Sequence, residues 1–214
     1  MRPLSELINP DDSALPIIEE LAAKVSGRCV VLPPRPDSGE ILYRTQVTTR
    51  SPMGAVVYHT GGIVVDRWIR IIGSGSSIIE RNLPDWNSSR ANGFYLIGDD
   101  VVGGFFAIDG GGLGFEKGHV CYWAPDSLEW ISMERGYTDF LVWSMTMDTT
   151  DFYGDLRWSS WEAEVTSVPG DRCFGFYPFL WTVEGSASSS KRAIVTVEEA
   201  FDMKMDICRQ LSEP

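Results

Sequence analysis

Residues 119–131 read His-Val-Cys-Tyr-Trp-Ala-Pro-Asp-Ser-Leu-Glu-Trp-Ile, two runs of strand-forming residues on either side of a turn sequence. Pro125 presets a turn dihedral, and the Asp126 side chain can bond to its own backbone. The stretch therefore predicts two strands, 119–123 and 128–131, that reverse direction and pair with each other.

The same pattern extends towards the N-terminus. Phe94–Ile97 and Val101–Ile108 flank Gly98-Asp99-Asp100, a composition typical of a reversing turn between paired strands. A strand region is predicted at 63–72, and a short strand at 29–32 ends where prolines remove backbone donors. The centre of the chain is thus predicted to be an antiparallel meander.

Helical periodicity flanks the meander. Apolar residues recur at helical spacing in 13–25 and 137–145, and Ser160 can cap a run that ends at Val168. The stretch 40–49 fits neither period cleanly and is assigned to a helix. The predicted fold class is α+β, one domain over residues 1–214, with an N-terminal helix and C-terminal helices packed on a central antiparallel meander sheet.

The C-terminal helix has the clearest start signal. Thr196-Val-Glu-Glu199 matches a capping box, in which the Thr hydroxyl and the Glu carboxylate each bond to a backbone donor of the other residue. Helical spacing from there predicts one inward-facing stripe of apolar residues: Phe201, Met205, Cys208 and Leu211.

Composition excludes several classes of function. The chain has 214 residues, 43% of them hydrophobic, and a formal charge of −12, which opposes binding to nucleic acid and favours encounter with a basic protein. Neither a signal-peptide run nor a stretch long enough to span a membrane is visible, so a cytoplasmic protein without membrane association is expected. Four scattered cysteines and two histidines suggest no zinc site, and no cofactor motif is complete.

Two segments carry weak signals for chemistry. The glycine-rich residues 73–77 lack the lysine and spacing of a phosphate-binding loop, and 109–114 offers only Asp109 to a calcium ion, so both are interpreted as turns. His119 and Cys121 share a strand face, but this placement does not secure the hydrogen bond that a thiol nucleophile needs. No catalytic residue is assigned.

Candidate binding residues come from the tryptophans and from the acids near the meander turns. Tryptophan is frequent in binding hot spots, and Trp123, beside the turn at Pro125, is the best candidate for a partly exposed anchor. The candidate set is Trp68, Asp99, Asp100, Asp109, Trp123 and Asp126.

The order of several motifs resembles a bacterial family known as domain of unknown function 2625, over nearly the whole chain. The motifs are Val47–Ala55, His59–Asp66, Asp100–Asp109, Tyr122–Asp126 and Phe176–Trp181. More distantly, the glycine pair Gly61-Gly62 before the first meander strand, Asp109, and the aromatic helix at 137–141 are similar to the SUKH superfamily, which implies immunity proteins or regulators that act by protein contact. The segment after about residue 150 departs from that pattern.

Two hypotheses follow. The leading one is a non-enzymatic protein-binding module, an immunity-type inhibitor of a toxin being one form of it, with a basic protein as partner and a homo-oligomer left open. The rival is a small hydrolase or transferase that uses the carboxylates of the meander turns, with Asp109, Asp126 and His119 converging.

Overall fold

The structure is a computed structural model, and it describes residues 1–25 and 27–212. Within these residues, seven strands form one sheet in the order β1-β2-β3-β4-β5-β6-β7, and every neighbouring pair is antiparallel. The predicted meander is confirmed. Its strands are β1 (Cys29–Leu32), β2 (Gly62–Val65), β3 (Ile69–Ile72), β4 (Phe94–Asp100), β5 (Phe105–Asp109), β6 (Val120–Trp123) and β7 (Trp130–Ser132).

The turn predicted at Gly98–Asp100 is wrong. Strand β4 continues to Asp100 because Asp99 lies opposite Arg70 of β3, where the two side chains form a buried ion pair. The chain reverses at 101–104 instead, where Gly103 has a φ of 83° that a residue with a side chain rarely adopts. The Asp100 carboxylate supports this turn by accepting hydrogen bonds from the backbone N–H groups of Val102 and Gly104.

Helices cover both faces of the sheet. One core contains Ile18 of α2 and Phe140 of α6, and the opposite core contains Leu42 of α3 and Phe201 of α9. The helices of the structure are α1 (Leu4–Leu7), α2 (Leu15–Lys24), α3 (Ser38–Thr45), α4 (Pro52–His59), α5 (Leu83–Asn87), α6 (Tyr137–Thr146), α7 (Thr150–Tyr153), the 3-10 helix η1 (Gly154–Leu156), α8 (Trp161–Val165) and α9 (Val197–Ser212).

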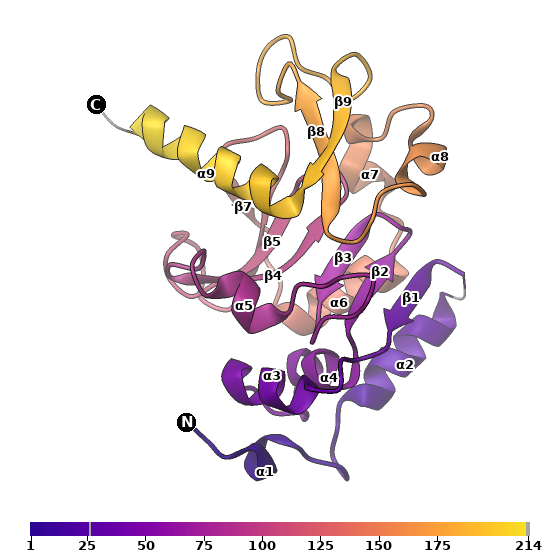
Figure 1. Ribbon diagram of the computed structural model, residues 1–214, viewed down its shortest axis with the longest axis vertical. Helices are drawn as coiled ribbons and strands as arrows, with labels where there is room; N and C mark the ends of the chain where they lie inside the picture. Colours follow the sequence, from indigo (N-terminus) through magenta and orange to yellow (C-terminus); the bar gives the residue numbers. More distant parts are fainter. Residues whose placement is uncertain (26, 213–214) are drawn as a thin grey trace.

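A second sheet follows the meander. Strands β8 (Arg172–Tyr177) and β9 (Lys191–Thr196) form an antiparallel hairpin, and α9 follows β9 directly. The hairpin and α9 lie together at the end of the molecule opposite α1 (Figure 1). Contacts that join the hairpin region to the meander include a hydrogen bond from the Phe174 N–H to the Val101 carbonyl at 2.8 Å, one from Arg70 to the backbone carbonyl of Arg172, and the ion pair of Arg81 with Asp171 at 2.5 Å.

The capping box is confirmed at the junction between β9 and α9. Thr196 Oγ1 accepts from the Glu199 N–H at 3.0 Å, and Glu199 Oε2 accepts from the Thr196 N–H at 2.9 Å. Phe201 is buried as predicted, but Leu211 is 71% exposed, because the last turns of α9 extend beyond the body of the molecule (Figure 1).

Candidate functional site

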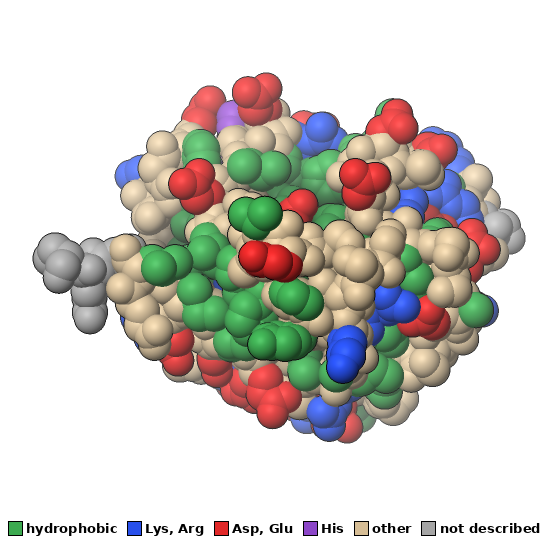
Figure 2. Space-filling view, turned by 90° about the horizontal axis from the view of Figure 1, so that it is seen from above, with side chains coloured by type: hydrophobic (Ala, Val, Ile, Leu, Met, Phe, Trp, Pro, Cys, Tyr) green, Lys and Arg blue, Asp and Glu red, His purple; other side chains and the backbone are tan. Residues whose placement is uncertain are grey.

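A cavity of about 260 Å³ lies between the β8–β9 hairpin, the loop after β8 and helix α9. Residues of the β4–β5 turn and Pro125 complete its wall, which is almost wholly apolar. Figure 2 shows apolar side chains gathered on the side of the molecule that carries the hairpin and α9. An apolar cavity of about 150 Å³ can hold benzene, so this one has room for roughly one ring with a short chain.

Small residues create the hollow. Gly175 of β8 lies directly opposite Ala193 of β9, and residues paired in this way share one face of a hairpin. Both line the cavity, together with Ala200 of α9. A Cβ at Gly175 would meet a methyl of Val195 at 3.4 Å, which is ordinary contact, so a side chain fits there and would occupy the hollow.

The rim is aromatic and exposed. Phe179 stacks on Trp181 with ring centroids 4.6 Å apart, and Tyr177 meets the edge of Phe179 at 6.3 Å. Tyr177 is 71% exposed, and Met203 on the α9 side is 39% exposed. Aromatic and methionine side chains that are exposed to solvent are typical of binding surfaces.

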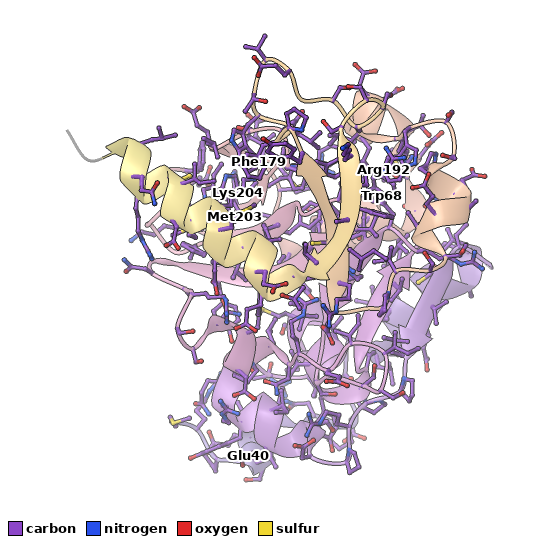
Figure 3. All side chains as sticks on the ribbon, turned by 45° about the horizontal axis from the view of Figure 1, so that its top comes forward. Glu40, Trp68, Phe179, Arg192, Met203 and Lys204 are labelled. Atoms are coloured by element: carbon purple, nitrogen blue, oxygen red, sulfur yellow. The ribbon has the colours of Figure 1, made fainter. Side chains whose placement is uncertain are left out.

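Lys204 of α9 is one of the residues that line this apolar cavity. Figure 3 shows Lys204 and Met203 on α9 beside Phe179. The Lys204 side chain is 2% exposed, its Nζ donates to the backbone carbonyl of Ala124, and it lies 4.3 Å from the centroid of the Trp123 ring. None of the ion pairs among the described residues includes Lys204. Burial lowers the pKa of this amine to about 7, against a smaller upward effect of the Asp100 carboxylate.

Trp123 is not the partly exposed anchor that the sequence suggested. It is 1% exposed, because α9 covers it: Phe201 meets its ring at 5.8 Å and Lys204 lies over its face. Trp68 is also fully buried, between rings of α7 and α8. Of the six candidate binding residues, Asp126 alone is exposed, in the turn after β6. A binding role for the six stays a prediction, and three of them, Asp100, Trp123 and Asp126, lie around Lys204.

Asp99 and Asp100 are buried and have partners inside the protein. Asp99 accepts from Arg70 Nε at 2.6 Å and from Arg81 Nη1 at 2.7 Å. The Asp100 carboxylate accepts the Tyr122 hydroxyl at 2.6 Å, and burial raises the pKa of both groups. Both acids thus stabilise the end of strand β4 that lies near the hairpin.

The three side chains of the hydrolase hypothesis do not converge. Asp109 and His119 lie at one end of the β5–β6 pair, whereas Asp126 follows the other end of β6. Burial alone would raise the pKa of the Asp109 carboxyl, but N–H groups of its own loop donate to it, from Gly111 at 2.5 Å and Phe115 at 2.8 Å among others, and together bring its pKa below the usual value. Over residues 1–25 and 27–212, no group of three or more His, Cys, Asp or Glu is placed to hold a metal ion.

Sequence reasoning missed Lys204, although one signal pointed to it. Lys204 stands three residues after Phe201 and four before Cys208, within the stripe of α9 that helical spacing assigns to the interior. A lysine in an otherwise apolar stripe is a buried cation in need of an explanation. Gly175 and Ala193 gave no such signal, because their pairing is visible only in the hairpin register.

These features define an α+β protein with a seven-strand meander, a separate hairpin and an apolar cavity beneath that hairpin. The profile of a family described as "Protein of unknown function DUF2625" matches residues 4–200, and the chain belongs to that family. The chain is similar to the putative uncharacterized protein YbfG of Escherichia coli K12, with 39% identity over 212 residues, 95% of this chain and 96% of that protein. An uncharacterized protein of Haemophilus influenzae is 37% identical over 189 residues, 84% of this chain and 83% of that protein.

The family resemblance read from the sequence is thereby confirmed. The more distant similarity to the SUKH superfamily stays a prediction, as does the cytoplasmic location. Among the described residues, no helix has both the length and the apolar character needed to cross a bilayer.

Proposed function

We propose that this chain is a binding protein that takes the apolar part of a small molecule into the cavity between the β8–β9 hairpin and α9. The observation that carries the proposal is the hollow itself, which Gly175 and Ala193 leave in an apolar wall that opens on an aromatic rim. Binding sites for small molecules are typically concave and apolar, with few polar groups that orient the ligand. Here Lys204 and Glu199 supply the charged groups on the wall.

The size of the cavity sets the expected affinity. Small ligands gain between about 0.3 and 1.5 kcal/mol of binding free energy per non-hydrogen atom, so a ring compound of about seven such atoms, at roughly 0.6 to 0.8 kcal/mol each, gains about 4 to 5.5 kcal/mol on binding. A probe of a single ring such as toluene is therefore expected to bind with a Kd on the order of 0.1 to 1 mM.

Thermal unfolding with toluene tests the proposal. At about ten times the Kd, ligand binding stabilises the folded state by about 1.4 kcal/mol and raises the Tm by roughly 3 to 6 °C. The variant Gly175→Leu fills the hollow and is expected to lose this rise, while Gly175→Ala, which adds one methyl group at the same position, retains most of it. The proposal fails if toluene leaves the Tm of the wild-type protein unchanged or stabilises Gly175→Leu equally.

A protein partner is the second candidate, favoured by the exposure of the rim. Tyr177 is 71% exposed and Met203 is 39% exposed, at the mouth of a cavity that has room for one apolar side chain. The formal charge of −12 favours a basic partner, as the sequence predicted. A pull-down from the native host with wild-type and Tyr177→Ser protein tests this candidate, and Val183→Ser, a fully exposed position in the loop between β8 and β9, is the matched control. A partner that Tyr177→Ser captures as well as the wild-type protein does not use the rim.

A further inference from the structure

We infer that Lys204 is a nucleophilic amine, and that the ligand class of the cavity includes aldehydes and ketones with an apolar substituent, which Lys204 holds as an imine. This inference rests on the proposed function, because the cavity must first receive the apolar substituent.

The surroundings of the Lys204 amine favour its neutral form. The side chain lines an apolar cavity, no ion pair among the described residues includes it, and its Nζ donates to the backbone carbonyl of Ala124 beside the Trp123 ring. The titratable groups around it come from three elements: Asp100 of β4, Asp126 of the turn after β6, and Cys208 of α9. Their combined effect is smaller than that of burial, so the pKa of Lys204 stays at about 7.

The lysines of this chain divide sharply by environment. Lys24, Lys117 and Lys191 are exposed, whereas Lys204 is 2% exposed. At pH 7 an amine with a pKa of about 7 is half neutral, while an ordinary lysine is neutral in less than about one molecule in a thousand. Only the neutral amine has the lone pair that attacks a carbonyl carbon, so Lys204 is the lysine prepared for this reaction.

The reaction needs no component beyond the ligand and water. The Lys204 lone pair forms a bond to the carbonyl carbon, and the π electrons of the carbonyl move to its oxygen, which takes a proton from water. The nitrogen loses one proton to water, and water supplies the proton that lets the new hydroxyl group depart as water while the C=N bond forms. The iminium nitrogen then releases its remaining proton to the hydroxide produced, so that the net change is one imine and one water from one amine and one carbonyl. The apolar walls keep bulk water away from the imine, which slows its hydrolysis.

Reductive trapping tests this inference. The full-length protein is incubated at pH 7 with benzaldehyde and sodium cyanoborohydride, which reduces the imine to a stable secondary amine. Peptide mass mapping then locates each adduct, whose mass gain equals that of benzaldehyde minus one oxygen atom. We expect labelling of Lys204 to be at least about tenfold faster than labelling of Lys24, Lys117 or Lys191, with a half-maximal rate near pH 7.

Two variants separate a nucleophilic role from a structural one. Gly175→Leu keeps Lys204 and blocks the cavity, so it is expected to lose the Lys204 adduct while the exposed lysines react as before. Gly175→Ala is the control that retains it. Equal labelling of all four lysines, or the absence of a Lys204 adduct in a protein that binds toluene, would overturn the inference and leave the proposed function standing. Loss of toluene binding in the wild-type protein would defeat the proposed function itself.

Discussion

Asp99 lies between two guanidinium groups in the interior, and its removal should be costly. Arg70 and Asp99 are 3% and 0% exposed, and Arg81 bonds to the second oxygen of the same carboxylate. Asp99→Asn leaves the buried Arg70 without its anion and Arg81 with Asp171 alone, and we expect a loss of about 3 to 5 kcal/mol in the free energy of unfolding, measured by urea denaturation. Glu20→Gln, which breaks the exposed pair with Lys24, is the control and should leave stability almost unchanged. Equal effects of the two substitutions would contradict the assigned role of Asp99.

Lys204 makes the free energy of unfolding rise with pH above neutrality. Its pKa in the folded state, about 7, lies below that of the unfolded chain, so between pH 7 and about 10 the unfolded state binds more protons and stability rises with pH. The slope due to this one group approaches about 1.4 kcal/mol per pH unit. Below pH 7 both states are protonated and the contribution is constant.

Lys204→Met keeps an unbranched apolar side chain as long as the lysine stem and removes the amine. We expect the variant to be more stable than the wild-type protein at pH 6, and this advantage to shrink as the pH rises towards 10. Unfolding by urea at a series of pH values measures the difference. A constant difference from pH 6 to 10 would show that the pKa of Lys204 is not lowered by folding.

The capping box at Thr196 and Glu199 stabilises the start of helix α9. Thr196→Ala removes the acceptor for the Glu199 N–H, and we expect a loss of about 1 kcal/mol in the free energy of unfolding. Because α9 forms one wall of the cavity, the same variant should also bind toluene more weakly. Thr146→Ala in α6 is the matched control, since the Thr146 hydroxyl bonds only to a carbonyl of its own helix. If both variants unfold at the same urea concentration as the wild-type protein, the capping box does not stabilise α9.

The elements that local chemistry specifies were predictable. Alternation and turn residues gave β6 and β7, and the Thr196–Glu199 spacing gave the start of α9. The turn predicted at Gly98–Asp100 failed because a residue distant in sequence sets the end of this strand. Strand β4 extends through Asp99 because Arg70 lies opposite it in β3, and local composition does not reveal that pairing. The helix predicted from Ser160 to Val168 is confirmed only as Trp161–Val165.

The candidate site was less predictable than the fold, because it is assembled from segments far apart in the chain. Trp123 and Lys204 are 81 residues apart, and the burial of one depends on the placement of the other. A lysine within the apolar stripe of α9 was the single local clue. The hollow arises from two small residues on different strands, which become neighbours only through the register of the hairpin.

For the whole molecule, we expect the cavity beside α9 to bind the ligand and the meander sheet to support the elements that form that cavity. Carbon-13 NMR of the methionine methyl groups during a toluene titration tests this most directly, because Met203 lines the cavity while Met1 and Met147 are exposed elsewhere, at 81% and 55%. If toluene binds in the cavity, the Met203 signal shifts and saturates in the wild-type protein but not in Gly175→Leu. The signals of Met1 and Met147 do not shift. Shifts of equal size at all three methionines, or an unmoved Met203 signal, would contradict it.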